Sequence, residues 1–158
     1  MKILYVEDDP NKVKDVTRFF NEYIPNCNLT IANSYTSGVI EIQSMSFDLI
    51  LLDMSLPLYD FKDCDPDEAN DFETFAGMDI LEEMKRTKVQ TNVIIITAFD
   101  VLGEYENKLN LEQINERMLK EFSLSYKGII HYNTSSLEWS NALKNYLNLY
   151  YSLKQSNT

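Results

Sequence analysis

The sequence has little of what secreted, zinc-binding or membrane-spanning proteins need. Its only cysteines, Cys27 and Cys64, form no C-x-x-C pair, so they indicate neither a disulfide framework nor a zinc cluster. No apolar run approaches the roughly 20 residues of a transmembrane helix. The apolar start of the chain meets Glu7 too early for a secretory signal. We therefore expect a cytoplasmic protein with free thiols and no contact with a membrane.

Basic residues are also scarce. Lysine and arginine together number 14 against 25 acidic residues, and the formal net charge is −11. A field of this sign repels nucleic-acid phosphates, so we expect no direct binding to nucleic acid. Cations and basic protein surfaces are the expected partners. Because 44% of the residues are hydrophobic, the chain is expected to be globular rather than disordered.

Short β-rich apolar runs alternate along the chain with segments of helical periodicity. The expected strands are residues 3–6, 29–32, 49–52, 93–96 and 129–130. The expected helices are residues 11–23, 36–43, 78–86, a segment within 111–122, and 137–153. This alternation is typical of βαβ units. It predicts an α/β fold with a doubly wound, five-stranded parallel sheet and helices on both faces.

The character of the runs also predicts the order of the strands. Runs 3–6, 49–52 and 93–96 are unbroken and apolar, as expected of strands buried on both faces. Runs 29–32 and 129–130 alternate or end quickly, which is typical of edge strands. Three central and two outer strands fit the flavodoxin-like order 2-1-3-4-5, in which ligands bind at the carboxyl ends of strands one and three.

We expect one domain over residues 1–154 and a tail at 155–158. Two connections are longer than a βα unit needs: an acidic insertion at about 58–76 and an extended segment at about 99–127. Residues 54–76 contain seven acidic residues and one lysine. The alternating acids at 63–67 resemble the start of a calcium loop, but the glycine and glutamate that such a loop requires are absent. The pattern favours a solvated acidic loop or a docking surface.

Acidic and hydroxyl side chains follow the expected central strands. Glu7 and Asp8 follow the first, Asp53 follows the third, and Thr97 follows the run of the fourth. A lone acid at such a place is commonly a helix cap, whereas acids at neighbouring strand ends should converge on one crevice. Crowded carboxylates need a cation, and Mg²⁺ prefers oxygen ligands. A carboxylate beside Mg²⁺ can attack phosphorus and form an acyl phosphate, with the Thr97 hydroxyl bonding a phosphoryl oxygen.

Several segments resemble those of one known family. Residues 2–10, KILYVEDDP, are similar to the opening of a response-regulator receiver domain of two-component signalling. Residues 47–57, FDLILLDMSLP, resemble its phosphoacceptor strand. Residues 77–81 resemble the start of its third helix, and residues 93–98 its fourth strand. The resemblance therefore runs in order along essentially the whole chain.

The resemblance implies a role for each matching residue. Asp53 would accept a phosphoryl group from a histidine kinase or a phosphotransfer protein. Glu7 and Asp8 would hold Mg²⁺ together with Asp53 and the backbone carbonyl of Ser55. The hydroxyl of Thr97 would move toward the phosphoryl group as a switch, while Asp9, just outside the acidic pair, would cap the first helix.

The chain departs from the family at the fifth strand. The family has a lysine, usually followed by proline, at the end of this strand, where it pairs with the acceptor carboxylate and the phosphate. Residues 128–134 here read GIIHYNT, and Lys127 lies at the wrong end. The family's aromatic switch residue is also absent, since an isoleucine, 129 or 130, takes its place.

Two functions remain open from the sequence. The first is a stand-alone receiver that signals through a downstream protein and is no enzyme beyond its own phosphorylation and hydrolysis. The second is a pseudo-receiver that acts as an adaptor without phosphorylation, which the missing lysine favours. A haloacid-dehalogenase-like phosphatase would need Asp-x-Asp where this chain has Glu7-Asp8-Asp9. Outer aromatic residues such as Tyr151 favour a homodimer surface near the fourth and fifth elements.

Overall fold

A parallel sheet forms the centre of the computed structural model, which describes residues 1–60, 72–73, 75–99, 101–102 and 109–152. Five strands pair in the order β2-β1-β3-β6-β9. They are β1 (Lys2–Val6), β2 (Asn28–Ala32), β3 (Leu49–Leu52), β6 (Asn92–Thr97) and β9 (Tyr126–His131). All the pairings in this sheet are parallel. Counted along the chain, these strands have the order 2-1-3-4-5, so the predicted flavodoxin-like sheet is confirmed.

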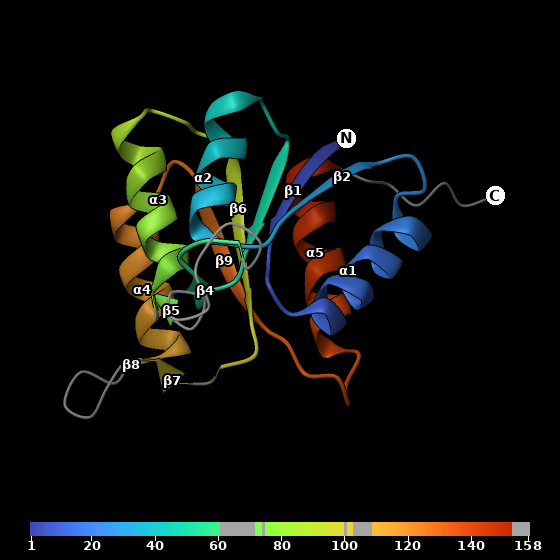
Figure 1. The fold of residues 1–158 in the computed structure, drawn as a ribbon. Helices are drawn as coiled ribbons and strands as arrows, with labels where there is room; N and C mark the ends of the chain where they lie inside the picture. The colour runs from blue at the N-terminus through green and yellow to red at the C-terminus, as the bar shows by residue number, and fades with distance from the viewer. Residues whose placement is uncertain (61–71, 74, 100, 103–108, 153–158) are drawn as a thin grey trace.

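Helices cover both faces of the sheet. They are α1 (Pro10–Tyr23), α2 (Tyr35–Ser44), α3 (Ala76–Arg86), α4 (Leu111–Glu121) and α5 (Glu138–Tyr151). Figure 1 shows α1 and α5 on one side of the sheet and α2, α3 and α4 on the other. Within the described ranges, no helix has both the length and the apolar character that crossing a bilayer requires.

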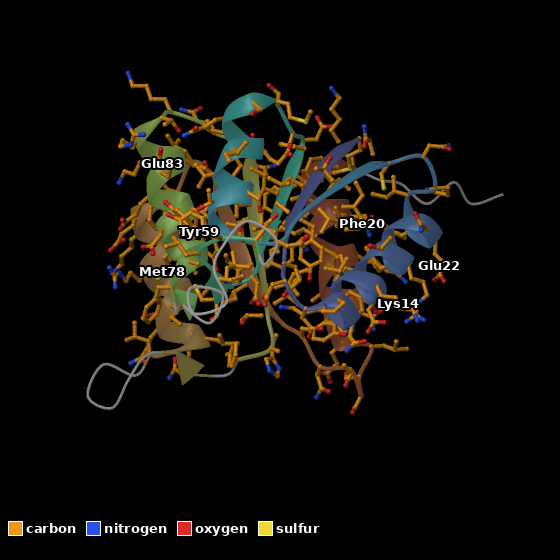
Figure 2. The ribbon with its side chains drawn as sticks, viewed as in Figure 1. Lys14, Phe20, Glu22, Tyr59, Met78 and Glu83 are labelled. Carbon is orange, nitrogen blue, oxygen red and sulfur yellow. The ribbon has the colours of Figure 1, made fainter. Side chains whose placement is uncertain are left out.

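Each face of the sheet packs its own hydrophobic core. The core on the α1 and α5 side includes Phe20 and Trp139, and the opposite core includes Met78 and Met118. The residues of β3 are all buried. In β9 buried and more exposed positions alternate, and in β2 only Ala32 is buried, as expected of edge strands. In Figure 2, Phe20 points from α1 toward the sheet, while Lys14 and Glu22 lie on the outer face of the helix.

Two details at the end of the chain differ from the sequence prediction. The strand β9 begins at Tyr126 rather than at residue 129, because alternate side chains already point into the core from its first residue. The side chain of Tyr151 packs against a core instead of lying outside it. Its hydroxyl donates a hydrogen bond of 2.7 Å to the carbonyl of Asp48 and accepts one of 3.2 Å from Asn92. Tyr151 is therefore a structural residue at the amino ends of β3 and β6.

Two small antiparallel sheets border the long connections. Strand β4 (Leu56–Pro57) pairs with β5 (Phe72–Glu73), and β7 (Val101–Leu102) pairs with β8 (Leu109–Asn110). Each strand has two residues, too few for an apolar periodicity, so the sequence did not predict them. The alternating acids at 63–67, most of the acidic insertion and the tail at 155–158 lie outside the described residues.

Candidate functional site

The sheet brings together the three carboxylates that the sequence placed at strand ends. The backbone N–H of Asp53 donates to the carbonyl of Val6 at 3.0 Å, so the pairing of β1 with β3 continues to the acids themselves. One carboxylate oxygen each of Glu7, Asp8 and Asp53 lie within 4.8 Å of one another. Glu7 and Asp53 are buried, and Asp8 is half-buried, so the cluster meets solvent on the Asp8 side.

Glu7 is held by donors on all sides. Its Oε1 accepts hydrogen bonds of 3.0 Å from the backbone N–H groups of Asp8 and Asp9. Its Oε2 accepts one of 3.3 Å from the hydroxyl of Tyr5, which is itself buried in the sheet. Burial, together with the nearby Asp53, raises the pKa of Glu7 to about 7, although Lys12 acts in the opposite direction.

The structure adds one residue that the sequence analysis missed. Lys12, in the first turn of α1, extends its side chain into the acidic cluster and is only 2% exposed. Its Nζ lies 2.5 Å from Glu7 Oε2 and 3.2 Å from Asp53 Oδ2. The cluster therefore already contains one cation, which bridges the acids of two neighbouring strands. The signal in the sequence was its position four residues before Val16, on the buried face of the helix.

The other predicted residues lie around this cluster. Asp9 caps α1, as the resemblance implied, with its side chain accepting the N–H of Asn11 at 2.9 Å. Thr97 ends β6 and is fully buried, and its hydroxyl oxygen accepts the N–H of Phe99 at 3.3 Å. Ser55 lies half-buried in the bend between β3 and β4. Burial raises the pKa of Asp8 above its ordinary value, with Asp53 adding to the shift.

An aromatic ring, not a lysine, follows β9 at the site. Tyr132 is buried, and its ring centroid lies 5.8 Å from Lys12 Nζ. Its hydroxyl donates a hydrogen bond of 2.6 Å to Asp15 Oδ2 on α1, which fixes the ring against that helix. At the carboxyl end of β9, the ring of Tyr132 therefore packs against the ammonium group of Lys12.

The oxygen ligands of this cluster fit a hard divalent cation. Glu7, Asp8 and Asp53 offer carboxylates only, and Mg²⁺ prefers such ligands. Three carboxylates against one ammonium group leave an excess of negative charge, which a divalent cation would neutralise. Because Glu7 is enclosed by protein donors, a cation from solvent would approach through Asp8 and Asp53.

The raised pKa of Glu7 predicts a pH-dependent stability. Below pH 4.5, the pKa of Glu7 in the unfolded chain, Glu7 is protonated in both the folded and the unfolded protein. Between pH 4.5 and 7 it keeps its proton in the fold but loses it in the unfolded chain, so the fold becomes less stable as the pH rises. Relative to a Glu7→Gln variant, the wild type should lose up to about 3 kcal/mol of unfolding free energy between about pH 4.5 and 7.5. Urea unfolding with EDTA across this range measures the difference. Parallel pH profiles for the two proteins would contradict the assignment.

Known proteins that are similar to this chain were found by sequence and by structure. No family model matches it. It is 28% identical over 144 residues to the Detocs response regulatory protein DtcB of Enterobacter cloacae, covering 90% of this chain and 95% of that protein.

Solved structures show the same fold at lower identity. The response-regulator receiver domain protein of Clostridium thermocellum superposes with a TM-score of 0.56 at 22% identity, covering 96% of this chain and 98% of that one. The response regulator TrrA of Thermotoga maritima, solved in complex with Mg²⁺ and BeF, superposes with a TM-score of 0.55 at 15% identity, covering 91% of this chain and 96% of that one.

Proposed function

The chain has the fold of the response-regulator receiver domains, as its sequence predicted, and from this premise we propose that it is a stand-alone phosphoacceptor whose Asp53 takes up a phosphoryl group with Mg²⁺. The observation that carries the proposal is the convergence of Glu7, Asp8 and Asp53 at the carboxyl ends of β1 and β3. In this strand order, that edge is where a ligand site is expected.

The proposed reaction is transfer of a phosphoryl group from a phosphohistidine. A carboxylate oxygen of Asp53 attacks phosphorus, an O–P bond forms, and the N–P bond breaks with its electron pair going to the histidine nitrogen. Attack of water on the resulting acyl phosphate returns inorganic phosphate and the carboxylate. Bound Mg²⁺ would neutralise charge on the phosphoryl oxygens.

The residues around Asp53 have distinct parts in this proposal. Glu7, Asp8 and the backbone carbonyl of Ser55 would hold Mg²⁺ with Asp53. The Met54 N–H already donates to Asp53 Oδ1 at 2.7 Å and fixes the orientation of the acceptor. The buried hydroxyl of Thr97 would turn from the Phe99 N–H toward a phosphoryl oxygen and pass the change to the loop that follows β6.

The proposal also specifies partners. The phosphoryl donor is a histidine kinase or a phosphotransfer protein in the cytoplasm, and the signal passes to a downstream protein by contact. The chain turns over no other substrate. The name of the Enterobacter relative, a response regulatory protein, supports this placement, as does the Mg²⁺ and BeF complex of the Thermotoga protein.

Incubation with acetyl phosphate and Mg²⁺, followed by intact mass, tests the proposal. We expect the wild type to gain the mass of one phosphoryl group and Asp53→Asn to gain at least about 100-fold less, because the amide is no nucleophile. Asp9→Asn is the matched control: asparagine also caps a helix, so its labelling should equal that of the wild type. Labelling that survives Asp53→Asn would contradict the proposal.

One observation favours a second function. The ion pairs of Lys12 connect Glu7 and Asp53 directly, as an adaptor with a fixed site would require. A mass that stays unchanged with both acetyl phosphate and a histidine kinase would favour this phosphorylation-independent adaptor.

A further inference from the structure

Lys12 places a charge on the buried face of α1. A buried lysine must give up its hydration, and a buried ion pair is often no more stabilising than apolar side chains of similar size in place of both partners. It also lies in the first turn of α1, where the helix dipole is positive and disfavours a cation. The neighbouring buried positions of the helix, Val16, Phe19 and Phe20, are all apolar. The charge at this one position therefore calls for another explanation.

The ammonium group of Lys12 lies beside the carboxylate of Asp53, the proposed acceptor. Of the salt bridges in the described part of the chain, only the two of Lys12 reach the acidic cluster. One leads to Glu7 Oε2 and the other, at 3.2 Å, to Asp53 Oδ2. The ring of Tyr132 lies against the ammonium group, with its centroid 5.8 Å from Nζ. Glu7 and Tyr132 thus hold the lysine in place beside the carboxylate that would be modified.

Modification of Asp53 would strengthen the need for this cation. An acyl phosphate carries more negative charge than the carboxylate it replaces, so the excess of anions in the cluster would grow. A lysine ammonium is a compact donor that binds phosphate oxygens well, and it would need only to exchange Asp53 Oδ2 for an oxygen bonded to phosphorus. Within the described ranges, the end of β9 offers no lysine or arginine for this task, because it continues from His131 into Tyr132.

We propose that Lys12 is the phosphoryl-binding cation of this site, supplied by the first helix instead of the last strand. The inference rests on the proposed phosphorylation of Asp53. It assigns Lys12 a binding role toward the phosphoryl group, and it makes the same ammonium group a competitor of Mg²⁺, because both cations face the carboxylate of Asp53.

The test compares two ligands whose affinities should change in opposite directions. Calorimetric titration measures the affinity for Mg²⁺ alone. It then measures the affinity for beryllofluoride, a phosphoryl mimic, at saturating Mg²⁺. Relative to the wild type, Lys12→Met should bind Mg²⁺ about tenfold more tightly, since a nearby positive charge is removed. It should bind beryllofluoride at least about tenfold more weakly, since a charged donor is lost.

Matched variants separate this role from a structural one. Lys14→Met changes an exposed lysine of the same helix and should alter neither affinity. If Lys12→Met does not fold, Lys12→Met/Glu7→Gln, which removes one charge of each sign, is compared with Glu7→Gln and should show the same opposite changes.

Each outcome decides between explanations. Weaker binding of both ligands would mean that Lys12 only maintains the fold, and tighter Mg²⁺ binding with unchanged beryllofluoride would mean simple repulsion; either result overturns the inference. If the wild type binds no beryllofluoride and gains no phosphoryl group, the proposed function fails and this inference fails with it. If the wild type binds it and the Lys12 variant binds it equally, only the inference fails.

Discussion

Replacing Lys12 by methionine should lower the free energy of unfolding by about 3 to 5 kcal/mol at about pH 8 without Mg²⁺. The side chain of methionine has nearly the same length, so little packing is lost. In the described structure, Lys12 provides the only ammonium group between Glu7 and Asp53. Both of these acids are buried. Two carboxylates would then face each other with no cation, and desolvation would oppose the charge of each.

The loss of unfolding free energy in Lys12→Met should depend on pH and on the charge of Glu7. Near pH 5, Glu7 takes up a proton in the fold, so the destabilisation should shrink. Near pH 8, the Glu7→Gln substitution should recover most of the loss, because one of the two opposed charges is gone. Urea unfolding with EDTA measures all four proteins of this cycle, and Lys14→Met should stay within about 0.5 kcal/mol of the wild type. Equal losses at both pH values would contradict the ion-pair explanation.

The second large effect is expected from Gly77→Ala, which should slow phosphorylation of Asp53 about 100-fold. A Cβ at Gly77 would lie 2.8 Å from the carbonyl oxygen of Asp53 and 3.3 Å from the Cα of Met54. Both are backbone atoms that cannot rotate away, so either α3 or the end of β3 must move. A shift of that segment displaces the acceptor carboxylate from the acids of β1 and should also cost about 1 to 3 kcal/mol of stability.

Another glycine provides the control for this prediction. A Cβ at Gly128 on β9 would come 1.9 Å from the hydroxyl of Tyr146, the far end of a side chain that can turn away. Gly128→Ala should therefore lower stability while leaving the rate of labelling by acetyl phosphate within about twofold of the wild type. Time courses of intact mass, taken at matched folded fractions, measure both variants. A wild-type rate in Gly77→Ala would show that α3 does not position the acceptor.

The sheet could be predicted because the composition of each strand indicates how far the strand is buried. The unbroken apolar run of β3 marks a strand covered on both faces, and the edge strand β2 shows partly exposed positions. Parallel pairing then brought Glu7 and Asp53 to one edge, so the acidic cluster followed from the fold class. The small sheets were missed because two-residue strands depend on pairing across long connections rather than on any local pattern.

Lys12 shows where sequence reasoning stopped short. Lys12, three residues after Asp9, was not singled out from the sequence, although it shares the buried face of α1 with Val16. Helical periodicity can show that a charged residue falls on a buried face. It cannot show which acids meet it there, because that depends on how far α1 leans over the ends of β1 and β3.

A crystal structure of the wild type grown with Mg²⁺ and beryllofluoride tests the account most directly. We expect beryllium bonded to a carboxylate oxygen of Asp53 and one fluorine within about 3 Å of Lys12 Nζ. The metal should contact Asp53 together with Asp8. Beryllofluoride bound away from Asp53, or a Lys12 side chain that still bridges only the two carboxylates while the fluorines face other donors, would contradict it.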